Sequence, residues 1–202
     1  MFCAFSGEEY GLYGSKAYAQ RCAQEGMDIL GYFNLDMIGY LKPSSTVIKT
    51  TLIYPQSALE LAQFYTNVCS IYLPSFLVEP GTLLGGSSDH ESFNNNGYMG
   101  IFPFEDVDNH SPYIHTANDT VGLSYNNVPM ATTFTKATLA SVVTMSNMRF
   151  PPKNLVALPS DNVVELFWDY VVDVSCYKVY KNGTLCDSVT TNYFADFDVV
   201  NG

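Results

Sequence analysis

The chain opens with an apolar run that stops at a glycine turn and is followed at once by two adjacent glutamates. The run covers residues 1–5 and predicts a strand. Gly7 permits the turn, and Glu8 and Glu9 come next, before a helix predicted over residues 15–25. Side chains at the carboxyl end of a strand face the crevice where open α/β sheets hold their ligands. Two carboxylates placed there repel each other unless a cation or a proton-transfer role stabilises them. The pair is therefore either part of a functional site or an acidic turn exposed to solvent.

Strand and helix patterns alternate along most of the following sequence. Apolar segments typical of strands occupy residues 29–37, 46–54 and 98–104, and helices are predicted over residues 55–72 and 127–148. Ser88 and Glu91 have the spacing of a capping box, which predicts a short helix that Gly97 ends. The fold class of this part of the chain is therefore α/β.

Composition excludes several classes of protein. The net charge is −11 and the nine Lys and Arg residues form no basic stripe, which argues against binding of nucleic acid. No apolar run reaches the length of a membrane span, so none is expected. The five cysteines contain no CxxC pair, so we expect no cysteine zinc site. Their spacing leaves open whether Cys176 and Cys186 form a disulfide.

A different pattern begins near the paired prolines at positions 151 and 152. Alternating apolar residues predict strands over residues 163–168 and 176–180, and Asn182-Gly183 is a strong hairpin signal. We therefore expect a linker at residues 150–153 and a separate β domain over residues 154–202.

Trp168 is the single tryptophan of the chain, and a Tyr-x-Val-Tyr strand follows it. This β segment resembles the fibronectin type III sandwich. Such a sandwich needs about seven strands and roughly 100 residues. The resemblance therefore implies an all-β, immunoglobulin-like sandwich that is truncated.

Four short motifs follow one another along residues 1–149. They are Gly7-Glu8-Glu9, Asn34-Leu35-Asp36-Met37, Ser88-Asp89-His90 and Ile114-His115-Thr116. In their order and approximate spacing they resemble the M28 family of zinc aminopeptidases. The resemblance implies that residues 1–149 are the C-terminal part of a peptidase domain. Its architecture would be phosphorylase/hydrolase-like, with three layers and a mixed central sheet.

The resemblance also implies a site with two zinc ions and a water between them. On the positions that match the motifs, Glu8 is the general base, and Glu9, Asp36 and His115 are zinc ligands. A free carboxylate beside a metal-binding one can take the proton of the water and pass it to the leaving amine. Adjacent glutamates at a glycine turn suit this division of roles.

Two of these residues have simpler interpretations when taken alone. Asp36 is also compatible with the cap of a strand end, and His115 with an ordinary surface residue. If His115 binds metal, its second nitrogen needs a hydrogen-bond acceptor, for which Asp89 and Asp119 are the candidates.

Apolar residues near the strand ends are candidates for the substrate pocket. Met37, Phe104 and Tyr113 could wall a pocket for the first side chain of a substrate, and the alternative is that they belong to the core. Glu105 matches a recurrent strand end in some relatives, and is either structural or part of the substrate mouth.

The His-x-Asp motif, with which the resembled family supplies further metal ligands, has no match here. The three histidines of the chain are His90, His110 and His115, and none of them stands in that context. We therefore expect this chain to be part of a longer protein and to be inactive in isolation.

The expected function of the longer protein is zinc-dependent removal of N-terminal residues from peptides. One alternative is a catalytically inactive remnant that serves as a binding module. Another is a different chemistry on the same scaffold, either glutaminyl cyclisation or carboxypeptidase action. An accessory β module implies a secreted, periplasmic or cell-surface location, while the oligomeric state stays open.

Overall fold

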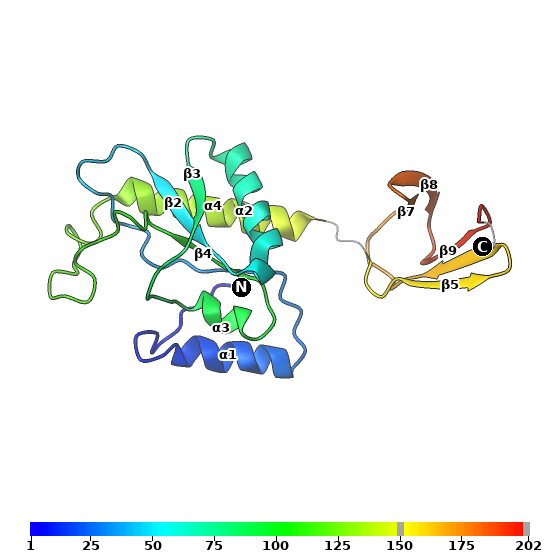
Figure 1. The fold of residues 1–202 in the computed structure, drawn as a ribbon, viewed down its shortest axis with the longest axis horizontal. Coiled ribbons are helices and arrows are strands. Elements are labelled where there is room, and N and C mark those ends of the chain that lie inside the picture. Colours follow the sequence, from blue (N-terminus) through cyan, green and yellow to red (C-terminus); the bar gives the residue numbers. More distant parts are fainter. Residues whose placement is uncertain (149–151, 200–202) are drawn as a thin grey trace. The chain divides into compact units, whose positions relative to one another are not determined.

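The computed structural model describes residues 1–148 and 152–199 of the chain. The chain divides into two compact units, Met1–Asn147 and Met148–Gly202, which Figure 1 shows in sequence colours. Three predictions fall partly outside the described residues: the end of the peptidase segment at residue 149, residues 150 and 151 of the linker, and residues 200–202 of the sandwich.

The first unit contains a mixed sheet of four strands in the order β1-β4-β2-β3. Their bounds are β1 Tyr32–Phe33, β2 Lys49–Ile53, β3 Leu77–Gly81 and β4 Gly100–Phe104. β1 runs parallel to β4, β4 runs antiparallel to β2, and β2 runs parallel to β3. The prediction of an α/β fold with a mixed sheet is confirmed.

Four α-helices and a short 3-10 helix accompany the sheet. They are α1 Tyr13–Gln24, η1 Gln56–Ala58, α2 Leu59–Tyr72, α3 His90–Asn94 and α4 Val128–Asn147. α2 buries one stripe of its surface, from Leu61 to Cys69, because apolar residues recur there every three to four positions. In Figure 1, α1 and α3 lie together below the strands, whereas α2 and α4 lie beside β2 and β3.

Strand β4 is buried along its whole length, because helices cover both faces of the sheet. Ile101 belongs to the apolar core that α2 and α4 build, whereas the ring of Phe102 lies 5.0 Å from that of His90 in α3. Successive side chains of a strand point to opposite faces, so α3 lies opposite α2 and α4. The fully or nearly buried residues of this core are Leu52, Ala58, Leu61, Ala62, Tyr65, Cys69, Phe76, Ile101, Met130, Phe134 and Ala137.

Three local predictions are wrong. Residues 1–5 form no strand, and the side chains of Met1 and Phe2 are exposed, because no neighbouring strand pairs with this segment in the described residues. The predicted strand over residues 29–37 is reduced to the two residues of β1, which pair only with β4 at the edge of the sheet. The capping box at Ser88 does not form, since the Ser88 hydroxyl bonds Asn34 and Asp36 instead of the helix.

In the second unit, the described residues form two small antiparallel sheets. One has the order β5-β6-β9 and the other is the hairpin β7-β8. The bounds are β5 Val156–Ser160, β6 Val163–Phe167, β7 Tyr177–Lys181, β8 Thr184–Val189 and β9 Tyr193–Asp196. Trp168, Tyr177 and Val179 form the buried centre of this unit. The hairpin predicted at Asn182-Gly183 is confirmed, with both residues at positive φ as a tight two-residue turn requires.

Two further sequence questions are answered by the structure. Cys176 and Cys186 are both exposed free thiols, so the structure does not pair them. Within residues 1–148 and 152–199, none of the helices combines the length and the apolar character that crossing a bilayer requires.

Candidate active site

The glutamate pair lies in a tight turn that the backbone holds in place. Gly7 has a φ of 71°, and the N–H groups of Gly11 and Leu12 donate to the Glu8 carbonyl oxygen at 3.0 and 2.8 Å. The N–H of Gly14 donates to the Ser6 carbonyl oxygen, and a Cβ at Gly14 would lie only 2.7 Å from that oxygen. The turn therefore favours glycine at positions 7 and 14, and it delivers both glutamates to the start of α1.

Asp36 is held just beyond the end of β1 by a chain of side-chain hydrogen bonds. Tyr32 donates to Asn34 at 3.1 Å, Asn34 donates to the Ser88 hydroxyl at 2.8 Å, and Ser88 donates to Asp36 Oδ2 at 2.9 Å. Because β1 and β4 are parallel, their carboxyl ends lie at the same edge of the sheet. Asp36 therefore lies at the edge where α/β sheets hold their ligands.

His115 reaches the glutamate pair from a loop that is distant in sequence. Its Nε2 lies 3.1 Å from Glu9 Oε1, and both side chains are mainly exposed to solvent, at 71% and 66% respectively. His115 has a φ of 60°, a backbone conformation that is uncommon for residues other than glycine. The structure thus brings together two of the motifs found in the sequence.

Negative charge accumulates around this contact. Burial raises the pKa of the Glu8 carboxyl above its usual value, and the nearby charges of Asp36, Glu9 and Asp89 raise it further, while His115 lowers it. Burial likewise raises the pKa of Asp36, against the hydrogen bond from Ser88. Carboxylates that raise each other's pKa in this way are stabilised by a cation between them.

Several observations bear on whether the residues fit a zinc ion. An imidazole nitrogen and a carboxylate oxygen are ligands that zinc prefers, and Glu9 and His115 supply one of each. Asp89 adds a buried Oδ1 atom that has no hydrogen-bond partner in the described part of the chain. Among the described residues, however, no three His, Cys, Asp or Glu side chains are grouped closely enough to hold a metal. The donor atoms of Glu9 and His115 are of the types that zinc prefers, but the described residues supply fewer than three ligands in one place.

The remaining predicted residues are spread over different environments. Asp119 is exposed in the loop after His115, and Asp89 is half-buried at the start of α3. The His115 hydrogen bond that the structure contains goes to Glu9, and the role of Asp89 or Asp119 toward the other ring nitrogen stays a prediction.

The three pocket candidates do not share one surface. Phe104 is only 1% exposed and packs against Phe102 in the interior. Met37 and Tyr113 are half-buried, and the Tyr113 ring meets the ring of Tyr40 edge-on at 6.5 Å. The substrate pocket stays a prediction, for which Met37 and Tyr113 are the accessible residues.

Two polar residues that the sequence analysis names have bonds in this region that the sequence does not predict. Ser88 connects Asn34 to Asp36, although its spacing to Glu91 predicts a helix cap. Glu105 is buried directly after β4 and bonds two loops, which favours the structural one of its two predicted roles, although the sequence does not indicate its partners.

Comparison with known proteins identifies the family. The model for Peptidase family M28 matches residues 1–139. The chain belongs to peptidase family M28.

Individual members and neighbours agree with this assignment. A probable leucine aminopeptidase 1 from Trichophyton verrucosum is 32% identical over 123 residues, which cover 58% of this chain and 32% of the fungal protein. LapB from Legionella pneumophila superposes with a TM-score of 0.64 at 27% identity, over 72% of this chain and 39% of LapB. A glutaminyl cyclase from an Acidobacteriales bacterium reaches a TM-score of 0.50 at 18% identity, over 66% of this chain and 45% of the cyclase, a likeness of fold alone. The M28 chain spans about a third of the length of the curated relatives that it matches.

Proposed function

We propose that this chain carries the general base and part of the metal-binding residues of a zinc-dependent aminopeptidase. The observation that carries the proposal is the 3.1 Å contact between His115 Nε2 and Glu9 Oε1, which joins a loop to a turn more than a hundred residues earlier in the sequence. Membership in a peptidase family supports hydrolysis of peptide bonds as the reaction. The resemblance to fungal leucine aminopeptidases supports action at the N-terminus of the peptide.

In this proposal Glu9 and His115 hold one zinc ion and Asp36 holds a second. When bound, zinc supplies an acidified water and polarises the carbonyl group that is attacked. Glu8 is adjacent to Glu9 and serves as the general base, which takes a proton from the attacking water and returns it to the leaving amine. The Gly7 turn supports this division, because it lets one glutamate face the metal while its neighbour stays free.

The proposal assigns the remaining metal ligands to residues that this chain does not provide. A catalytic zinc ion usually has three protein ligands besides water. The described residues contain no group of three suitable side chains, and positions 149–151 and 200–202 hold no His, Cys, Asp or Glu. The 202-residue chain alone is therefore proposed to bind zinc weakly and to be inactive.

For the second unit, we propose a fibronectin type III-like accessory module. Its five strands in two antiparallel sheets, with Trp168 in the buried centre, support this assignment. Small β modules of this kind often accompany exported enzymes, so we propose a secreted, periplasmic or cell-surface location for the protein.

The proposal is tested by zinc titration of the full chain, followed by NMR of the histidine side chains. Zinc should move the ring signals of His115, and both Glu9→Gln and His115→Ala should abolish or weaken binding about tenfold or more. Glu8→Gln should leave zinc binding unchanged, because a general base does not hold the metal. His110→Ala is the matched control, since His110 bonds the Val107 carbonyl oxygen away from the glutamate pair.

Equal loss of zinc in the Glu8, Glu9 and His115 variants would remove the distinction between base and ligand. No zinc response at His115 in the wild-type chain would remove the metal assignment and would favour a binding module without catalysis.

A further inference from the structure

Glu105 connects two loops of the peptidase unit through one buried carboxylate. It follows β4 directly in the sequence, and it is only 1% exposed. Its Oε2 accepts a hydrogen bond from the Tyr40 backbone N–H at 2.9 Å, and its Oε1 accepts one from the Ser111 backbone N–H at 2.8 Å. Hydrogen bonds to a carboxylate are among the stronger ones in proteins, so both loops are firmly tied to the end of β4.

The first of these loops carries Asp36. Met37 follows it with a φ of 47°, an uncommon conformation for a residue with a side chain. The Met37 carbonyl oxygen accepts the Glu105 backbone N–H at 3.1 Å, so Glu105 bonds this turn with its main chain and, through Tyr40, with its side chain. The surrounding bonds thus keep a strained turn in place beside Asp36.

The second loop carries His115, four residues after Ser111. The Ser111 hydroxyl accepts the N–H of Tyr113 at 3.2 Å and lies 2.6 Å from the hydroxyl of Ser124. The Tyr113 carbonyl oxygen accepts the N–H of Thr116 at 3.1 Å, which closes the turn around His115. The bond to Glu105 therefore fixes the start of the segment that ends in the His115 side chain.

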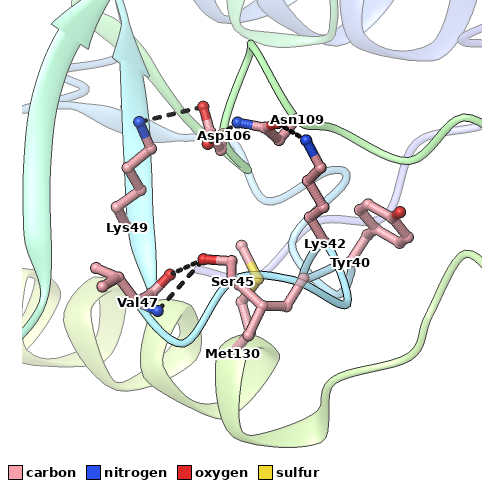
Figure 2. Close-up of a pocket in the computed structure, with 9 residues that line it drawn as sticks. Tyr40, Lys42, Ser45, Val47, Lys49, Asp106, Asn109 and Met130 are labelled. Atoms are coloured by element: carbon pink, nitrogen blue, oxygen red, sulfur yellow. Dashed lines mark hydrogen bonds and ion pairs between the residues drawn. The ribbon is translucent and has the colours of Figure 1, made fainter.

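The next residue, Asp106, forms bonds of its own with Lys49 and Asn109. Figure 2 shows Lys49 reaching Asp106, and Asn109 lying between Asp106 and Lys42. Lys49 Nζ lies 3.2 Å from Asp106 Oδ1, and the cavity beside these residues has a volume of about 10 Å³, room for about one water. Among the bonds of the described residues, those of Asp106 do not include Glu105, so Asp106 can be changed while both Glu105 bonds keep their partners.

We propose that Glu105 is a positioning residue that sets the separation of Asp36 from His115. The inference rests on the function proposed above, in which these two residues bind metal. Glu105 itself is too deeply buried to touch a substrate. Its role is to hold one loop with each carboxylate oxygen.

Glu105→Gln tests this role with little change in volume. Glutamine keeps one acceptor oxygen but replaces the other with an N–H₂ donor, which faces a backbone N–H that is also a donor. One loop should therefore lose its bond, and amide exchange of Tyr40 or Ser111 should accelerate about tenfold or more. In the metal-free chain, NMR signals of Asp36 and of the His115 ring should shift, whereas amides of α2 and α4 should stay unchanged.

Asp106→Asn is the matched control, because it changes the neighbouring acid together with its bonds to Lys49, Asp108 and Asn109, but removes neither bond of the Glu105 carboxylate. It should leave exchange at Tyr40 and Ser111 unaltered. Should Glu105→Gln fail to fold, Glu105→Asp keeps the charge but is one methylene too short to reach both loops, and the same local changes are expected.

Zinc binding gives a second readout. Glu105→Gln should weaken the zinc response of His115 about tenfold or more, the usual effect of removing a residue that orients metal ligands, and Asp106→Asn should not. Unchanged signals of Asp36 and His115 in Glu105→Gln would overturn the inference, as would a uniform acceleration of exchange throughout the unit, which marks a merely structural role. A wild-type chain without any zinc response would contradict the proposed metal site instead, and the exchange and NMR shifts of the metal-free chain would still decide the role of Glu105.

Discussion

At the scale of single residues, the site depends on backbone conformations that sequence patterns do not reveal. Met37 and His115 both have positive φ, and both lie next to or at a proposed metal ligand. Strained conformations persist only where surrounding bonds over-determine them, and they are frequent at functional sites. The buried carboxylate of Glu105 supplies such bonds to both loops.

Glu105 also predicts a pH dependence of stability. Burial is the main cause that raises the pKa of this carboxyl to about 7, and the charge of Asp36 raises it further. The hydrogen bonds from Ser111 and Tyr40 and the charge of His110 lower the same pKa. A folded-state pKa above the unfolded value means that the folded chain binds the proton more tightly. Protonated Glu105 therefore stabilises the folded chain. This contribution is fully present below the unfolded pKa of about 4.5 and is lost as the pH rises to about 7.

We therefore expect the free energy of unfolding to fall by about 2 to 3 kcal/mol between pH 4.5 and 7 through this group. Glu105→Gln should remove that part of the decline, and denaturant titrations at several pH values measure it. Asp106 does not affect stability between pH 4.5 and 7, because its pKa is lowered in the folded chain. Its stabilising contribution is lost only as the pH falls below this range, whereas that of Glu105 is lost as the pH rises. The same slope in Glu105→Gln and wild type would contradict the assignment.

Several of these residues were recognisable in the sequence, and others were not. The motifs that resemble those of the M28 family singled out Glu8, Glu9, Asp36 and His115, and the roles that the resemblance implies for them stay predictions. The contact between Glu9 and His115 depends on a loop conformation with positive φ, which no periodic pattern encodes.

At the scale of secondary structure, long amphipathic segments were predicted well and short ones poorly. The helix predicted over residues 55–72 appears as η1 followed by α2, because its buried stripe runs along most of its length. The strand predicted over residues 29–37 shrinks to two residues, since strand length depends on the neighbour that pairs with it. Ser88 failed as a cap because a tertiary partner, Asp36, competes for its hydroxyl.

The packing of α4 against α2 gives a prediction at this scale. Phe134 is fully buried, and its ring meets that of Phe76 edge-on at 5.1 Å. Phe134→Ala should lower the free energy of unfolding by about 3 to 5 kcal/mol, because it leaves a cavity in the core. Leu139→Ala on the exposed side of the same helix should change it by less than about 0.5 kcal/mol. Chemical denaturation followed by circular dichroism compares the two, and equal effects would show that this core is wrongly described.

At the scale of the whole molecule, two units with separate cores share one chain. The peptidase unit matches the M28 family, yet the chain covers only 32% of the length of its fungal relative. Its own donors do not complete a set of three in the described residues. The family and the activity of this chain are therefore separate questions.

We expect the 202-residue chain to show no aminopeptidase activity, even with added zinc. The physical reason is that zinc held by too few protein ligands is bound only weakly and is not oriented for hydrolysis. An assay with an aminoacyl chromogenic substrate, with and without a chelator, measures this. Turnover that a chelator abolishes would show that the chain completes the site by itself.

The central claim, that Glu9 and His115 bind the same metal ion, is tested most directly by a double-mutant cycle on zinc affinity. The affinities of wild type, Glu9→Gln, His115→Ala and the double variant are measured by calorimetry on the full chain. If both side chains bind one ion, the losses of zinc affinity caused by the two substitutions should be strongly non-additive. The double variant should then bind zinc no more than about threefold more weakly than the weaker single variant. Additive losses, or a single variant that binds zinc as well as the wild type, would contradict the account.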